Sequence, residues 1–233
     1  MPDDVRGTVI FDLDGTLVDS APDLADTLDT VLGEQGLAPV GLEGTRALIG
    51  HGIAALVRGA LIQRGCEMGE AEFSAILERF LHIYSGQLSA KTQTYPGVRR
   101  ALVTLRRARW RLVVCTNKRE DFSRKILEDL GLLPEFDVIA GSDTFGVAKP
   151  DPAHLTRTLP QGPPAPHLAI VVGDSAVDVE AARAAGLPVI AVAWGYARRP
   201  AYELGADEVV DSFEQVPAIV EKLARAHQIR TFS

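Results

Sequence analysis

Five short apolar runs recur along the chain, and each one ends at small or polar residues. The runs are rich in Val and Ile, which is typical of strands that are buried on both faces of a parallel sheet. They cover residues 9–11, 112–115, 136–140, 168–172 and 187–193. Between them, apolar residues recur at spacings of three and four, as in Val98, Leu102 and Leu105, which predicts helices. This alternation predicts an α/β fold with helices on both faces of the sheet.

One gap between the runs is too long for a single strand–helix–strand unit. From Asp12 to Thr116 the chain advances by 104 residues, whereas Thr116 and Lys149 are 33 residues apart. Since such a unit needs about 30 residues, roughly 70 are inserted after the first strand. The insert carries three apolar stripes at helical spacing: Leu24, Leu28, Val31 and Leu32; Ile53, Leu56, Val57, Ala60 and Leu61; Phe73, Ile76, Leu77, Phe80, Tyr84 and Leu88. We therefore expect a small helical bundle there.

The charge and the cysteine content narrow the class of protein. Lys and Arg number 24 and Asp and Glu 31, so the formal net charge is −7, which argues against a general binder of nucleic acid or anionic membranes. The longest apolar stretch, residues 187–194, is far shorter than the ~20 residues of a membrane helix. Two cysteines cannot form a disulfide framework, and residues 1–6 do not resemble a signal peptide. We expect a cytoplasmic protein, monomeric or homodimeric, that binds neither nucleic acid nor membranes.

Polar residues follow the predicted strands at the places where the strands end. In open α/β sheets, ligands bind beyond the carboxyl ends of the strands. The candidates there are Asp12 and Asp14, Thr116 and Asn117, Lys149, and Asp174 with Asp178. Carboxylates this close together repel one another unless a cation lies among them, and Mg²⁺ prefers oxygen ligands and accompanies phosphate. Together with the lysine, these carboxylates predict a site for phosphoryl transfer.

Four motifs resemble those of the haloacid-dehalogenase superfamily, in its phosphatase branch. The first is residues 11–20, FDLDGTLVDS, and the second is Thr116-Asn117; the third is residues 149–152, KPDP, and the fourth is residues 173–178, GDSAVD. All four occur in order, and the resemblance covers nearly the whole chain. It implies a Rossmann-like core of residues 1–17 and 92–233 with an α-helical cap domain of residues 18–91. This division agrees with the spacing of the apolar runs.

The resemblance also implies a mechanism for the residues that follow the first strand. Asp12 is expected to attack phosphorus and to form an aspartyl phosphate. Asp14 is expected to protonate the leaving oxygen and then to activate the water that hydrolyses the intermediate. Asp12, Asp174 and the backbone carbonyl of Asp14 are expected to bind Mg²⁺.

Other residues of the motifs are expected to hold the phosphate. The resemblance implies that Thr116 and Lys149 bind the phosphoryl oxygens, assisted by backbone N–H groups near Asn117 and Gly15. Asp178 is expected to orient Lys149 or the waters of the metal. Taken alone, Asp178 also suits the first turn of a helix, where a carboxylate offsets the helix dipole.

The cap is the part of the chain that distinguishes substrates, because the core is generic. Residues 49–57, IGHGIAALV, resemble the cap segment of bacterial phosphoglycolate phosphatases. Residues 50–53 are expected to open a cap helix, whose N-terminus suits a small anion such as a carboxylate. Arg46, His51 and Arg58 are candidates to pair with that carboxylate, and the alternative is that they are ordinary surface residues of the cap.

We therefore expect a Mg²⁺-dependent phosphomonoesterase that acts on 2-phosphoglycolate. Pyrophosphate, a sugar phosphate and N-acetylmuramate 6-phosphate are alternative substrates, and a phosphomutase similar to β-phosphoglucomutase is a further alternative. Thr16 and the lack of a mutase-like cap arginine argue against the mutase. A dehalogenase is disfavoured because Asp14 and Asp174 have no role in that chemistry. A catalytically silent binding protein is disfavoured because every catalytic position is filled.

Overall fold

The computed structural model describes residues 5–160 and 168–231, and its centre is a parallel sheet of six strands. In spatial order the strands are β5 (Val138–Ala140), β4 (Trp110–Cys115), β1 (Gly7–Phe11), β6 (Ala169–Gly173), β7 (Val189–Val192) and β8 (Glu208–Val210). Each neighbouring pair is parallel, and Val9 of the central strand is in register with Leu112 on one side and Ile170 on the other. The predicted α/β fold with a parallel sheet is confirmed.

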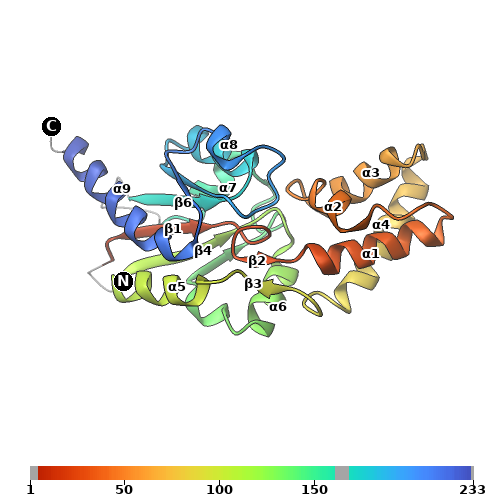
Figure 1. The fold of residues 1–233 in the computed structure, drawn as a ribbon, viewed down its shortest axis with the longest axis horizontal. Helices are drawn as coiled ribbons and strands as arrows, with labels where there is room; N and C mark the ends of the chain where they lie inside the picture. The colour runs from red at the N-terminus through yellow and green to blue at the C-terminus, as the bar shows by residue number, and fades with distance from the viewer. Residues whose placement is uncertain (1–4, 161–167, 232–233) are drawn as a thin grey trace.

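Helices cover both faces of this sheet (Figure 1). Val9 and Phe11 belong to an apolar cluster with residues of α5 (Val98–Arg107), α6 (Glu120–Asp129) and α9 (Val216–Thr231). Ile10, which points to the opposite face, belongs to a second cluster with residues of α7 (Pro152–Thr156) and α8 (Ala176–Ala184). Because side chains alternate along a strand, one short apolar run supplies both layers of the core.

Each of the five predicted apolar runs overlaps a strand, and the larger differences lie at the edges of the sheet. The run predicted at residues 136–140 begins as a strand only at Val138, because a 3₁₀ helix, Leu133–Glu135, precedes it. The edge strand β8 was not predicted. It has three residues, of which only Val210 is buried, so it lacks the continuous apolar run that marks the central strands.

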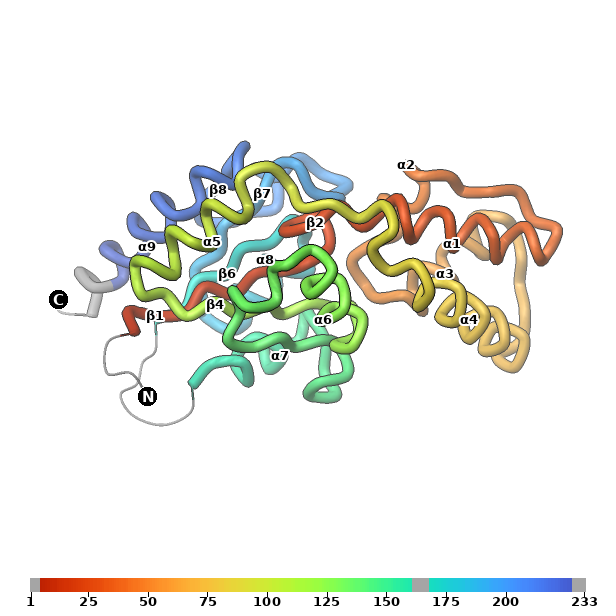
Figure 2. Tube along the Cα trace, turned by 90° about the horizontal axis from the view of Figure 1, so that it is seen from below, coloured from red at the N-terminus to blue at the C-terminus, as the bar shows by residue number. Residues whose placement is uncertain are grey.

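The insert after β1 is a helical cap that lies beyond one end of the sheet (Figures 1 and 2). It comprises α1 (Ala21–Glu34), α2 (Gly41–Arg46), α3 (Ile53–Gln63) and α4 (Glu70–Ser85), in which α1 contacts α2 and α4, and α3 contacts α4. The three predicted stripes supply most of the buried side chains of α1, α3 and α4. The predicted cap is therefore confirmed as a fold, while its boundaries at residues 18 and 91 stay a prediction.

Two short strands join the cap to the core. β2 (Val18–Asp19) and β3 (Gln93–Thr94) pair antiparallel, so the outgoing and returning chains run side by side. Near this ribbon, the carboxylate of Asp23 accepts hydrogen bonds from the N–H groups of Lys91 and Thr92 at 2.9 and 2.8 Å. Asp23 therefore holds the returning segment against the first cap helix.

Among the residues that the structure describes, no helix has the length and apolar character that crossing a membrane requires.

Candidate active site

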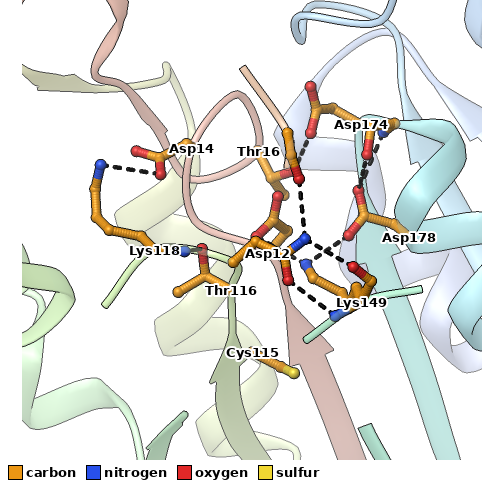
Figure 3. A network of polar contacts seen from close by, with 12 residues as sticks. Asp12, Asp14, Thr16, Cys115, Thr116, Lys118, Lys149, Asp174 and Asp178 are labelled. Carbon is orange, nitrogen blue, oxygen red and sulfur yellow. Dashed lines mark hydrogen bonds and ion pairs between the residues drawn. The ribbon is translucent and has the colours of Figure 1, made fainter. Parts of the chain in front are cut away.

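The predicted polar residues meet at the carboxyl end of the sheet, next to the cap (Figure 3). Asp12 follows β1, and its N–H donates to the carbonyl of Val172 in β6 at 2.9 Å. Thr116 follows β4, and its N–H donates to the carbonyl of Ala140 in β5 at 2.9 Å. Both residues extend the hydrogen-bonding pattern of the sheet, which fixes their backbones where their side chains face the site.

Lys149 lies between two carboxylates. Its Nζ is 2.9 Å from Oδ1 of Asp12 and 2.6 Å from Oδ1 of Asp178. Burial by itself lowers the pKa of Lys149, but the two carboxylates outweigh burial and hold this pKa above its usual value. Lys149 is therefore a fixed positive charge beside Asp12.

Three carboxylates come together at this end of the sheet. One oxygen each from Asp12, Asp174 and Asp178 lies within 4.8 Å of the other two. Burial raises the pKa of Asp12 to about 6 and raises that of Asp174 well above its usual value, and the neighbouring carboxylates add to both shifts. The buried Oδ1 of Asp12 has its ion pair with Lys149 but accepts no well-aligned hydrogen bond within the described residues. Clustered oxygen ligands with a surplus of negative charge fit a divalent cation such as Mg²⁺.

Asp178 combines the two roles that its position suggests. Its Oδ1 contacts Lys149, while its Oδ2 accepts hydrogen bonds from the N–H and the hydroxyl of Ser175 at 3.1 and 2.7 Å. The second set of contacts is a capping box at the start of α8. The helix cap thus fixes the carboxylate that contacts Lys149.

Asp14 points away from this cluster and towards the cap. Its Oδ2 is 3.1 Å from Nζ of Lys118, which in turn donates to the hydroxyl of Tyr84 in α4 at 2.9 Å. The hydroxyl of Ser20 donates to the other oxygen of Asp14. Ser20 is the N-cap residue of α1, but its hydroxyl makes no capping hydrogen bond because it donates to Asp14.

Lys118 and Tyr84 were not predicted as site residues. Lys118 directly follows the Thr116-Asn117 motif, and that adjacency was the available signal. Tyr84 was predicted only as a member of an apolar stripe, and it is fully buried as that stripe requires. The contact between Tyr84 and Lys118 joins the cap to the core. The periodicity of apolar residues within the cap or within the core therefore does not reveal this contact.

Gly15 allows a close approach between the first and fourth motifs. Its φ is +83°, and a Cβ atom at this position would lie 2.5 Å from Oδ2 of Asp174, so a larger residue would displace that carboxylate. The N–H of Gly15 donates to the carbonyl of Val18 at 2.9 Å. The expected contact between this N–H and a phosphate therefore requires that hydrogen bond to break.

The side chain of Asn117 connects the core to the cap. Its Nδ2 donates to the carbonyl of Gly50 at 3.0 Å and to that of Lys149 at 2.9 Å, and its Oδ1 accepts from the N–H of Lys149 at 2.9 Å. The carboxamide is thus occupied by protein groups. A role for Asn117 in phosphate binding rests on its backbone N–H, as predicted from the sequence.

The three cap residues nominated for the substrate's carboxylate lie in different surroundings. Arg46 contacts Oδ2 of Asp19 at 3.0 Å and Oε1 of Glu43 at 2.7 Å. Arg58 contacts Glu70 at 3.1 Å, and its guanidinium carbon lies 3.8 Å from the ring centre of Phe73.

His51, by contrast, is exposed and lines a cavity of about 570 Å³ between the cap and the core. This cavity also borders Asp14 and Asp174. Of the three nominated residues, His51 is the one placed beside the site.

Tyr196 links the site to the base of the cap. Its backbone N–H donates to Oδ2 of Asp174 at 2.7 Å. Its hydroxyl donates to Oδ1 of Asp19 at 2.6 Å and accepts from the N–H groups of Ser20 and Ala21 at 2.9 and 3.1 Å. Tyr196 was not predicted as a site residue, because it lies outside the four motifs and is 177 residues from Asp19.

Comparison with known proteins places this site in a family. Residues 9–192 match the family model described as haloacid dehalogenase-like hydrolase. The chain is 40% identical over 222 residues to the phosphoglycolate phosphatase of Mesorhizobium japonicum. This match covers 95% of this chain and 98% of that protein. It is 41% identical over 209 residues to the phosphoglycolate phosphatase of Rhodospirillum rubrum, over 88% of this chain and 87% of that protein.

A solved structure gives the same result. The crystal structure of a predicted phosphoglycolate phosphatase from Haemophilus somnus superposes with a TM-score of 0.85 and 30% sequence identity, and the match covers 91% of this chain and 97% of that chain. In this chain, residues of the four motifs meet at the carboxyl end of the sheet. The chain therefore belongs to the haloacid dehalogenase-like hydrolases, as an enzyme of the phosphoric monoester hydrolase class.

Proposed function

We propose that this hydrolase is a Mg²⁺-dependent phosphomonoesterase that acts on 2-phosphoglycolate through an aspartyl-phosphate intermediate. The observation that supports it most is the meeting of Asp12, Lys149 and Asp174 at the carboxyl end of the sheet, with Asp14 facing the cap. Phosphoryl transfer depends mainly on positioning and on neutralising charge, and these residues are suited to both.

In this proposal Asp12 is the nucleophile and Asp14 moves the proton. Asp12 forms a bond to phosphorus while the bond from phosphorus to the ester oxygen breaks, and Asp14 gives that oxygen its proton. Asp14 then takes a proton from water, which attacks the aspartyl phosphate and releases inorganic phosphate. The opposite directions of the two side chains support this division of roles, because one carboxylate faces Lys149 and the other faces the cap.

Lys149 and Thr116 hold the phosphoryl oxygens in the proposed mechanism. Lys149 is buried and held between two carboxylates, so its charge is in place before substrate arrives. The backbone N–H of Asn117 assists these two side chains, and that of Gly15 joins them when it leaves the carbonyl of Val18. Asp178 positions Lys149 rather than touching the substrate.

The residues that would hold Mg²⁺ are Asp12, Asp174 and the backbone carbonyl of Asp14. The crowding of carboxylates supports this assignment, as does the Oδ1 of Asp12, which contacts Lys149 but accepts no well-aligned hydrogen bond within the described residues. When bound, the ion supplies positive charge to the phosphoryl oxygens. Gly15 contributes by leaving room for Asp174 to approach the first motif.

The choice of 2-phosphoglycolate rests on the relatives and on the cap. Relatives about 40% identical over most of their length are named phosphoglycolate phosphatase. The cap helix α3 begins at Ile53 after Gly52, as the segment 49–57 predicts, and a helix N-terminus favours a small anion.

A panel of small phosphate esters tests the proposal. Turnover of 2-phosphoglycolate, glucose 6-phosphate, N-acetylmuramate 6-phosphate, pyrophosphate and ethyl phosphate is measured by phosphate release, with and without Mg²⁺. We expect the highest kcat/KM for 2-phosphoglycolate and no turnover without metal. A sugar phosphate as the best substrate would refute the assignment of 2-phosphoglycolate. Full turnover after chelation would refute the dependence on Mg²⁺.

A further inference from the structure

A small cavity between the core and the cap lies beside Asp14. Its volume is about 40 Å³. The residues that line it are Asp14, Leu24, Ile49, Gly50, Gly52, Ile53, Leu56, Thr116, Asn117 and Lys118. Because a single water needs about 10–15 Å³, the cavity has room for a small group such as a carboxymethylene group.

Among the described residues that line this cavity, Lys118 has the one cationic side chain. It is only 4% exposed. Its ammonium group has three N–H donors, and within the described residues it uses two of them, for Asp14 and for the hydroxyl of Tyr84. One donor is therefore left for an acceptor that enters the cavity.

The contacts of Lys118 keep its charge in place. Burial by itself lowers the pKa of Lys118, but Asp14 and Tyr84 outweigh burial and hold this pKa above its usual value. Tyr84 is itself fixed, because its ring packs edge-on against Phe122 of α6 at 5.7 Å between ring centres. A residue of the cap thus holds a lysine of the core.

The start of α3 faces the same cavity. Gly52 and Ile53 line it, and Gly52 is the N-cap residue, so no side chain caps the first N–H groups of this helix. Uncapped N–H groups and the positive end of the helix dipole favour an anion. Two independent features, a buried ammonium group and a helix N-terminus, therefore point to negative charge in a space that holds only a few atoms.

We propose that Lys118 binds the carboxylate of the substrate and that Tyr84 is a positioning residue for Lys118. This inference rests on the proposed action on 2-phosphoglycolate and names the residue that recognises it. An ester oxygen protonated by Asp14 lies at the mouth of the cavity, and a carboxymethylene group attached to that oxygen reaches Lys118. The apolar walls formed by Leu24, Ile53 and Leu56 suit the methylene carbon.

The test compares two esters that differ in the carboxylate. For wild type, Lys118→Met and Tyr84→Phe, kcat/KM is measured on 2-phosphoglycolate and on ethyl phosphate, whose leaving group also needs a proton but carries no charge. We expect the ratio of the two values to fall by about 10- to 100-fold in Lys118→Met, as for a lost charged hydrogen bond, and by a smaller factor in Tyr84→Phe. Lys125→Met, which removes an exposed lysine of α6 paired with Asp129, is the matched control.

The outcomes separate this inference from the function on which it rests. A wild-type ratio near one would refute 2-phosphoglycolate as the substrate. A high wild-type ratio that Lys118→Met leaves unchanged, with both esters slowed alike, would show that Lys118 serves Asp14 and not the carboxylate. Tyr84→Phe keeps the buried ring and removes one hydroxyl, so it carries the test if the lysine variant fails to fold.

Discussion

The carboxamide of Asn117 donates a hydrogen bond to the carbonyl of Gly50 at 3.0 Å, and this contact joins the active-site loop of the core directly to the cap. The same carboxamide makes two hydrogen bonds to the backbone of Lys149. The position of the cap loop and the position of the active-site lysine are therefore both fixed by one side chain.

Replacing Asn117 by Ala is expected to destabilise the protein. The N–H of Lys149 loses its acceptor, and the carbonyls of Gly50 and Lys149 lose a donor. Since the site is only partly buried, water satisfies some of these groups, and we expect the free energy of unfolding to fall by about 1–2 kcal/mol. Urea unfolding of the wild type and the variant measures this change in the free energy of unfolding. A change below about 0.3 kcal/mol would mean that these hydrogen bonds do not stabilise the fold.

Asp12→Asn is expected to abolish turnover without unfolding the protein. An amide is a poor nucleophile towards phosphorus, so kcat should fall by about a thousandfold or more. Thermal unfolding and circular dichroism check that the fold persists. Asp121→Asn, which changes an exposed carboxylate of α6, is the control. Activity within tenfold of wild type would exclude Asp12 as the nucleophile.

Removal of metal is expected to stop catalysis reversibly. EDTA should abolish activity, Mg²⁺ should restore it, and Ca²⁺ should inhibit, because the larger ion takes more oxygen ligands and engages both oxygens of Asp12. Mg²⁺ should also raise the melting temperature of the chelated protein, since it binds the folded carboxylate cluster. If Asp174→Asn shows the same rise in melting temperature as wild type, the ion does not bind there.

His154 is expected to make stability depend on pH. This residue is fully buried in α7, and its Nε2 lies 3.1 Å from the carbonyl of Gly141. Burial lowers its pKa from 6.5 to about 4, so the unfolded chain binds a proton at a higher pH than the folded protein does. The folded state should therefore lose stability as the pH falls from 6.5 to 4, by at most about 3 kcal/mol.

Urea unfolding across this pH range, for wild type and His154→Gln, isolates that effect. The variant is expected to be less stable at neutral pH, but its stability should fall less steeply below pH 6.5. Parallel pH profiles for the two proteins would show that His154 does not titrate in this way.

The nominated cap residues are expected to behave differently from one another. Arg58 is exposed and paired with Glu70, so Arg58→Ala should change kcat/KM by less than about twofold for both 2-phosphoglycolate and ethyl phosphate. His51 lines the larger cavity beside Asp14 and not the small cavity proposed for the carboxylate, so His51→Ala should slow 2-phosphoglycolate and ethyl phosphate by the same factor. A loss confined to 2-phosphoglycolate would show that His51, and not Lys118 alone, recognises the carboxylate.

The sequence predicts those parts of the site that depend on local order. Asp12 and Thr116 follow apolar runs directly, and Asp174 follows one after Gly173. In a parallel sheet the ends of such runs meet at one edge. Their meeting is therefore predictable before any contact is known. The helical insert is equally predictable, because it interrupts the regular spacing of the strands.

The contacts between cap and core are not predictable in this way. Tyr84 and Lys118 are separated by 34 residues, and Tyr196 and Asp19 by 177. Each pair meets because the cap packs against the core, and no periodicity within either part encodes how the two pack. The edge strand β8 was not predicted for a different reason. A half-exposed strand of three residues has too few apolar positions to be recognised in the sequence.

The two ends of Tyr196 have a mechanical consequence. Its hydroxyl accepts hydrogen bonds from the N–H groups at the start of α1, and its backbone N–H donates to the carboxylate of Asp174. A rotation of the cap about Ser20 must either break the contacts of the hydroxyl or pull on the residue whose amide fixes the carboxylate. The tilt of the cap and the alignment of Asp174 are therefore linked through one tyrosine, and a displacement of either is expected to displace the other.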